Sequence, residues 1–280
     1  MRLIVLLLLF SLVGCGQLIS SAKKDFAEDL ASTIMEQKDP ETVKQAIPTY
    51  LVLISSLIRG DDENIDLLVS GSTLYGAYAS VFVDDVDRKR ILANTSFEYA
   101  SRAVCLMKKK ACSLEEVSYY EFEQIIATFK KRDASLLFAL GAAWAGQIQA
   151  NTSDWNAVAD LPKVKATIAR VIELNEFVSN GDAHLYMAVM QSFLPPAMGG
   201  KPELAKQHFE RAIEISKGNN LMALLLYAEK YARLVFNKEL HDRLLKQLLD
   251  HEIGVSDKTL INTIAKSKAK ILLEESDDYF

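Results

Sequence analysis

Residues 202–213 read Pro202-Glu-Leu-Ala205-Lys-Gln-His-Phe209-Glu-Arg-Ala212-Ile213. Ala205, Phe209 and Ala212 follow one another at four- and three-residue steps, which puts all three on one face of a helix. Small residues on such a face let a neighbouring helix approach closely, and the aromatic ring fills the remaining gap. The stretch therefore predicts a helix over residues 202–216 that packs tightly against a partner helix.

Helical periodicity extends over most of the chain. It predicts helices after Asp39-Pro40 and after Leu161-Pro162, and over residues 23–37, 65–82, 88–108, 113–131, 134–149, 184–194, 221–236, 239–249 and 258–274. No segment alternates with the period of a strand. The sequence thus predicts an all-α fold, an α-solenoid-like array of helical hairpins. Residues 205–213 match the second helix of a tetratricopeptide unit, so the repeats are predicted to be degenerate tetratricopeptide repeats.

Local signals predict where some of these helices begin and how they are buried. Asp39 is a capping carboxylate before Pro40, but Pro48 lies inside the pattern, so the helix either begins later than Pro40 or is kinked at Pro48. Ser113-Leu-Glu-Glu116 has the spacing of a capping box and predicts a helix start. Residues 134–149 are apolar nearly all the way round, which predicts a helix in the middle of the structure.

The N-terminus has the pattern of an export signal. Arg2 precedes an apolar run, Leu3 to Val13, which at ~1.5 Å per residue is too short to span a bilayer. Leu12-Val13-Gly14-Cys15 resembles a bacterial lipobox, in which the cysteine is lipidated. We therefore expect a cleaved signal peptide over residues 1–14, a lipidated tether over residues 15–22 that begins with Cys15, and one helical-repeat domain over residues 23–280. The alternative is an ordinary signal peptide that contains a chance cysteine.

This N-terminus predicts a lipid-anchored protein of the bacterial cell envelope that faces the periplasm. Because Gly16, and not aspartate, follows the cysteine, the outer membrane is the expected site.

The net charge of the chain is −5, and loss of Arg2 with the signal peptide makes it −6. Lys and Glu are interspersed and form no basic surface, so nucleic acid is excluded as a partner. The chain carries no nucleophile elbow, P-loop or dinucleotide fingerprint, and we expect no enzyme activity, cofactor or metal.

Cys105 and Cys112 lie seven residues apart between two helical patterns. In an oxidising envelope they could form a short disulfide that joins the end of one helix to the start of the next. The spacing also allows two free thiols, because it does not show whether the Cα atoms come within disulfide range. Metal binding is not expected, since no second cysteine pair and no histidine is close by.

Two neighbouring stretches carry a family resemblance. They are Phe193-Leu-Pro195-Pro196-Ala-Met-Gly199-Gly200-Lys-Pro202-Glu and Phe209-Glu-Arg-Ala212-Ile213-Glu. Together they resemble the T component of tripartite ATP-independent periplasmic (TRAP) transporters, a family of envelope lipoproteins with degenerate tetratricopeptide-like helices. Supporting matches are Gly141-Ala-Ala-Trp144, Asp160-Leu-Pro162, Arg170-Val-Ile-Glu-Leu174 and Leu260-Ile-Asn262-Thr-Ile-Ala265.

The resemblance implies a transport accessory that docks the periplasmic substrate-binding protein of a TRAP transporter. It also implies an apolar cavity or pore that passes a small, partly apolar organic acid between the two proteins. Transporters of this kind can use oligomeric T components, a trimer among them, and the chain itself fixes no number. The alternative function is a general helical-repeat adaptor for envelope or outer-membrane protein assembly.

The loop over residues 195–202 is the first candidate for a ligand site. Pro195 and Pro196 fix a rigid entry to the loop. Gly199 and Gly200 permit backbone conformations that are closed to other residues. The apolar side chains of Leu194 and Met198 could face a cavity. The alternative is a structural crossover that positions the helix of Phe209.

Three aromatic residues could line a ligand channel: Tyr75, Tyr78 and Trp144. Aromatic residues at helical spacing can equally belong to the core.

Overall fold

The computed structural model describes residues 29–193, 200–254 and 256–280. Cys15 and the predicted signal peptide and tether lie outside the described residues. So do five residues of the predicted loop site, namely Leu194, Pro195, Pro196, Met198 and Gly199.

The described residues form helices and contain no strand, which confirms the all-α prediction. Residues 29–35 are helical, and the α-helices that follow are α2 Pro40–Gly60, α3 Ile65–Phe82, α4 Val86–Met107, α5 Tyr119–Ala127, α6 Ala134–Ala150, α7 Trp155–Ala159, α8 Leu161–Asn175, α9 Asp182–Gln191, α10 Pro202–Ile215, α11 Leu221–Leu226, α12 Lys238–Asp250, α13 Thr259–Glu274 and α14 Ser276–Tyr279. The described residues also form the 3₁₀ turns η1 Lys109–Ala111, η2 Lys131–Asp133 and η3 Val178–Gly181. A π-helical turn, η5 Tyr227–Ala232, continues α11.

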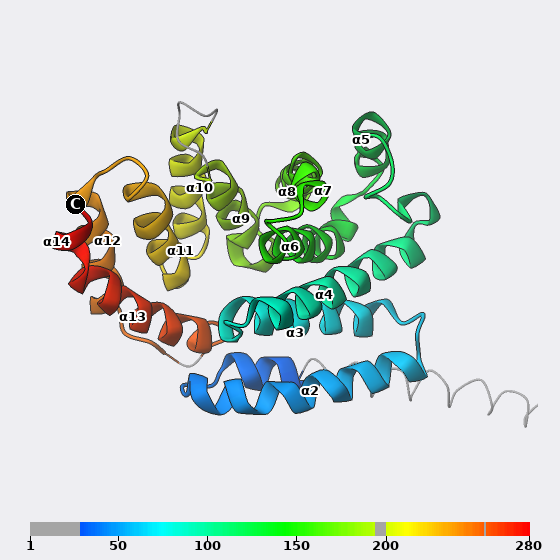
Figure 1. Cartoon of the computed structure of the whole chain (residues 1–280), viewed down its shortest axis with the longest axis horizontal. Helices are drawn as coiled ribbons and strands as arrows, with labels where there is room; N and C mark the ends of the chain where they lie inside the picture. The colour runs from blue at the N-terminus through cyan, green and yellow to red at the C-terminus, as the bar shows by residue number, and fades with distance from the viewer. Residues whose placement is uncertain (1–28, 194–199, 255) are drawn as a thin grey trace, which may run out of the picture.

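Neighbouring helices lie side by side in a curved array (Figure 1). In chain order α2 packs on α3, α3 on α4, α4 on α6, α6 on α8, α8 on α9, and α9 on α10. After α10 the chain turns through α11 and η5, which pack against α12 and α13. Repeated packing of antiparallel helices is compatible with a hairpin array; the tetratricopeptide-like repeat stays a prediction.

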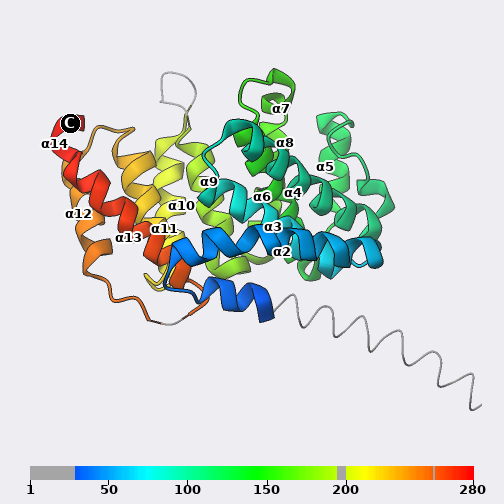
Figure 2. The same ribbon diagram turned by 60° about the horizontal axis from the view of Figure 1, so that its bottom comes forward.

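The two ends of this array meet. Leu260 and Ile264 of α13 share a buried cluster with Val43 and Ile47 of α2. Figure 2, which turns the molecule by 60°, also shows α13 next to α2. In an open solenoid each repeat contacts only its neighbours. The α2–α13 contact is therefore a long-range feature that periodicity does not predict.

Helix α2 begins at Pro40, which excludes the later start that the sequence also allowed. The Asp39 carboxylate accepts a 3.0 Å hydrogen bond from the Glu41 amide. Pro48 lies inside the helix, which continues to Gly60 although proline cannot donate a backbone hydrogen bond there. The buried face of α2 is an apolar stripe formed by Val43, Ile47, Leu51, Ile54 and Ile58.

The predicted helix start at Ser113 is wrong. Ser113 has a φ of 55°, in the left-handed region, whereas a helix N-cap takes extended backbone angles. The chain turns after Cys112, and α5 begins only at Tyr119, where the Ser118 hydroxyl accepts from the Glu121 amide. A capping-box spacing is thus present at Ser113 without the backbone conformation that would use it.

Helix α6 occupies the middle of the array, as its all-round apolar sequence predicts. It packs against α3, α4 and α8 (Figure 1). Gly141 allows the approach to α8, because a Cβ there would lie 2.7 Å from the Ile168 Cδ1 atom and 3.2 Å from the Thr167 Cγ2 atom. Small and large residues of the two helices therefore interlock in the largest buried cluster.

Candidate functional site

Trp144 belongs to this core. Its side chain is 1% exposed and packs against Phe97 and Phe122, with ring centroids 5.3 and 6.0 Å away. The apolar surface of the indole is therefore already covered by protein. The sequence allowed Trp144 to line a ligand channel or to belong to the hydrophobic core, and this packing favours the core.

The side chains of Tyr75 and Tyr78 also pack between helices. The Tyr75 hydroxyl lies 2.8 Å from the Ser55 hydroxyl, which also accepts from Tyr99, so α2, α3 and α4 share one hydroxyl cluster. Tyr78 is 3% exposed, and the Arg88 guanidinium donates to its hydroxyl. Both tyrosines therefore link helices through their polar ends, and neither has a free hydroxyl for a ligand.

The loop that carries the family motif connects α9 to α10. Of the predicted loop glycines only Gly200 is described, and it is half-buried. Before the loop Phe193 is 67% exposed; after it the Lys201 amide donates to the Gln191 carbonyl at 3.4 Å. This bond brings the two ends of the loop together at one end of the α9–α10 hairpin.

The structure joins Cys105 and Cys112 in a disulfide, with their Cα atoms 4.4 Å apart. Cys105 is on the last turn of α4, and Cys112 follows the short turn η1. The link therefore closes the chain at the point where α4 ends and the turn toward α5 begins.

Several residues that carry the family resemblance have structural roles. Asn262 of α13 accepts from the Leu221 amide at 3.0 Å and donates to the Asn219 carbonyl at 2.9 Å, so it caps α11 from a distance. Arg170 of α8 donates to the carbonyl of Ala127, the last residue of α5, and to that of Phe129 just after it. Long-range caps of this kind satisfy backbone groups that a helix end leaves unpaired.

Phe209, the aromatic residue of the opening motif, is fully buried. It stacks on Tyr227 of η5 with centroids 5.0 Å apart and planes inclined by 12°. Ala205 and Ala212 beside it are also buried, as the spacing predicts. The motif therefore encodes the packing of α10 against the π-helical turn.

A polar cluster at the other end of the α9–α10 hairpin was not predicted. The Nδ1 atoms of His184 on α9 and His208 on α10 lie 2.8 Å apart, and the ring centroids are 5.1 Å apart. His184 Nε2 lies 3.2 Å from Glu176, which caps α8, and Arg211 of α10 holds the same carboxylate with two bonds of 2.6 and 2.9 Å. The sequence places these groups on three separate segments; only the pairing of the two helices brings them together.

The surroundings of the cluster change the acidity of its members. Burial lowers the pKa of His184, and burial with the nearby His184 lowers the pKa of His208 to about 4. Hydrogen bonds from Arg211 lower the pKa of Glu176 to about 2. At neutral pH the cluster therefore contains two neutral imidazoles beside a carboxylate–guanidinium pair.

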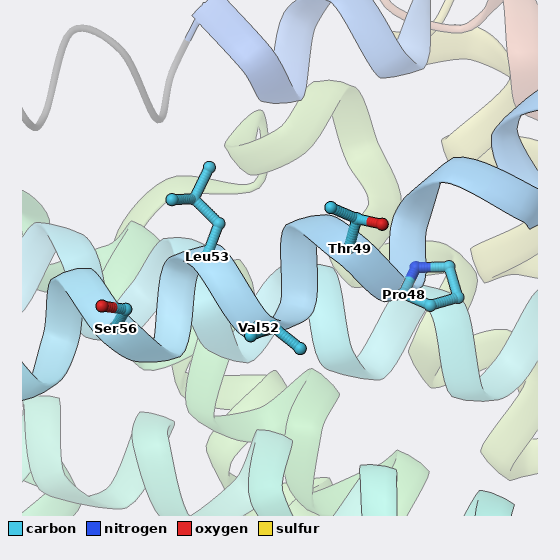
Figure 3. Close-up of a pocket in the computed structure, with 5 residues that line it drawn as sticks. All are labelled: Pro48, Thr49, Val52, Leu53 and Ser56. Carbon is cyan, nitrogen blue, oxygen red and sulfur yellow. The ribbon is translucent and has the colours of Figure 1, made fainter.

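An open hollow runs along the outer side of α2, lined by Pro48, Thr49, Val52, Leu53 and Ser56 (Figure 3). Val52 is 72% exposed there. No charged residue lies on α2 between Lys44 and Arg59, so this stretch of surface is uncharged over several turns. It is a surface hollow, distinct from the enclosed cavity that the resemblance implies.

Exposed aromatic residues occur at the opposite side of the molecule. Helices α5 and α7 lie away from α2 in both views (Figures 1 and 2). Tyr120 at the start of α5 is 74% exposed and Trp155 at the start of α7 is 82% exposed. Exposed tryptophan and tyrosine are the side chains most enriched at binding hot spots.

In the described part of the chain, no group of three or more His, Cys, Asp or Glu side chains is arranged to hold a metal ion. Nor is any described helix both long enough and apolar enough to cross a membrane.

Comparison with known proteins identifies the family. Curated proteins give no match to this chain. The family model described as TRAP transporter T-component matches residues 36–280, which include α2 and every later helix. The match covers far more than half of the sequence and includes both motif stretches. The chain therefore belongs to the TRAP transporter T-component family.

Proposed function

We propose that this protein is a lipid-anchored envelope accessory that docks the periplasmic substrate-binding protein of a TRAP transporter. The observation that carries the proposal is the family match over residues 36–280, which makes the chain an accessory component of such a transporter. The helical body, proposed to be a degenerate repeat array, supplies a rigid surface for a protein partner. Enzyme activity is not part of the proposal.

The proposed anchor is Cys15, exposed when a peptidase removes residues 1–14. Residues 15–22 then form the tether, residues 23–280 the helical body, and the outer membrane is the proposed location. Several acyl chains, at ~0.8 kcal/mol for each buried CH₂ group, would make attachment effectively permanent. The Cys15→Ala variant should lose incorporation of a labelled fatty acid and leave the membrane fraction.

The proposed docking surface is the edge that carries Tyr120 and Trp155. Both side chains are largely exposed, and both helices lie on the side away from α2. Because the tether enters through the helix before α2, a body anchored there would present this edge toward the periplasm. A soluble binding protein could reach the edge without meeting the membrane.

The proposed passage of a small, partly apolar organic acid depends on the loop that connects α9 to α10. Leu194, Pro195 and Met198 remain its candidate ligand contacts. Tyr75, Tyr78 and Trp144 are packed within the helical body and are not included.

The test is a crosslinking pull-down of the lipoprotein from its own membranes, with partners identified by mass spectrometry. The wild type should recover a periplasmic substrate-binding protein in stoichiometric amount. The double variant Tyr120→Ser with Trp155→Ser should lose most of that recovery, whereas Phe236→Ser should retain it. Phe236 is a suitable control because it is also largely exposed, at 65%, but lies just before α12.

Three other results would change the proposal. Recovery of outer-membrane assembly factors without a binding protein would favour the adaptor function. Equal recovery by all variants would move the docking surface elsewhere. Crosslinks between copies of the chain would support a homo-oligomer, and their mass would show whether it is a trimer.

A further inference from the structure

The His184–His208 contact has the geometry of a direct hydrogen bond between two imidazoles. The Nδ1 atoms are 2.8 Å apart, and the 5.1 Å centroid separation means that the two nitrogens point at each other. His184 is buried and His208 is half-buried, so the bond lies largely inside the α9–α10 hairpin. Such a bond needs a proton on one Nδ1 atom and a lone pair on the other.

Glu176 determines which ring carries that proton. Its carboxylate is held by Arg211 and can only accept, so His184 Nε2, 3.2 Å away, carries a hydrogen. Neutral His184 therefore has a bare Nδ1 atom, and His208 donates to it through Nδ1–H. One added proton can go to His208 Nε2 without breaking the bond. A second proton would have to occupy the Nδ1 atom of His184, where the donated hydrogen already points.

Charged groups from four elements surround this pair. Glu176 comes from the end of α8, and Arg211, bound also to Glu214, comes from α10. On α9 itself Asp182 is already paired at 2.9 Å with Lys258, the residue that precedes α13. The Glu176 carboxylate, which contacts His184, is thus neutralised by the Arg211 guanidinium. It therefore gives little electrostatic stabilisation to a second positive charge on the imidazole pair.

We propose that the His184–His208 bond is a proton-sensitive latch, which holds α9 against α10 at neutral pH and opens when the pair takes up its second proton. The inference does not depend on the identity of the transport partner. Helices α9 and α10, which the family-motif loop connects, should therefore separate more readily as the envelope compartment becomes more acidic.

Hydrogen exchange of the whole mature protein, corrected for intrinsic exchange rates, tests this proposal. A one-proton difference changes an opening equilibrium about tenfold per pH unit. Protection of the amides in residues 182–191 and 202–215 should therefore fall by ~10- to 100-fold between pH 6.5 and 4.5. Amides of α6 should keep their protection over the same range.

The matched variant replaces both rings, His184→Asn with His208→Asn, because a single change at His208 would leave His184 to take up a proton on Nδ1. Neither asparagine titrates, so hairpin protection in this double variant should be nearly independent of pH, whereas His251→Gln should behave as the wild type. Equal loss of protection in the wild type and the double variant would overturn the proposal, as would no loss in the wild type.

NMR of the wild-type histidines gives a second readout that needs no variant. At neutral pH His208 should be the Nδ1–H tautomer and His184 the Nε2–H tautomer. Ordinary titration of both rings near pH 6.5, without a tautomer preference, would also refute the latch.

Discussion

Substitution of Trp144 by alanine should strongly destabilise this protein, because the indole packs against two aromatic rings and is almost wholly buried. A buried tryptophan removes about 150–250 Å² from water. At about 25 cal/mol per Å² this area corresponds to roughly 4–6 kcal/mol. Alanine retains part of the contact and the cavity partly relaxes, so we expect Trp144→Ala to lower the free energy of unfolding by about 3–5 kcal/mol.

Urea unfolding followed by circular dichroism measures this effect. With a denaturant slope of about 3 kcal/mol per M, the midpoint should fall by roughly 1–1.7 M. The chain contains only one other tryptophan, Trp155, which is 82% exposed and serves as the control. Trp155→Ala should change stability by no more than about 0.5 kcal/mol.

Fluorescence provides an independent check of the same reasoning. In Trp155→Phe the only remaining indole is Trp144, and its emission should be blue-shifted and protected from aqueous quenchers. Loss of less than about 1 kcal/mol in Trp144→Ala, together with a quenchable Trp144, would refute the packing argument. It would restore the interpretation of Trp144 as part of a ligand channel.

Three further results are expected. Stability should fall with acidification in two windows. The upper one runs from pH 6.5 toward 4, because the folded pKa values of His184 and His208 lie below their unfolded values, and the lower one from about 4.5 toward 2, where Glu176 becomes protonated. Urea midpoints measured across pH test both windows, and the double variant His184→Asn with His208→Asn should flatten only the upper one. Replacement of both Cys105 and Cys112 by serine should cost about 2.5 kcal/mol, as expected for a closed loop of eight residues, and a reductant should lower the wild-type midpoint to that of the variant. Asn262→Ala should cost ~1–3 kcal/mol in the same assay, because the first amide of α11 is left buried without an acceptor; an unchanged midpoint would contradict the capping role.

The helices themselves could be predicted from sequence because their signals are local. The stripe on α2, the cap at Asp39 and the small-residue face around Phe209 all depend on residues within a few turns of one another. Ser113 shows the limit of such signals: its spacing fits a capping box, but its backbone is left-handed, and the helix starts at Tyr119 with Ser118 as its cap. Local spacing does not include the backbone angles that the surrounding chain imposes.

The candidate sites depended more strongly on tertiary structure. An aromatic residue at helical spacing is compatible with a core or with a channel, and only the packing of Phe97 and Phe122 against the buried Trp144 distinguishes the two. The cysteine pair was similarly open, because seven residues of separation do not fix a Cα distance. The two stretches around Pro195 and Phe209 nevertheless pointed to the family that the match over residues 36–280 shows.

The sequence by itself determined the all-α class, the position of most helices and the family, since each depends on periodicity or on a continuous motif. Only the tertiary structure decided that α13 closes on α2, that Asn262 caps a helix some forty residues earlier, and that His184 and His208 form one bond. These contacts join groups far apart in the chain. Whether such groups meet depends on the angles at which whole helices pack, and no local pattern of side chains records those angles.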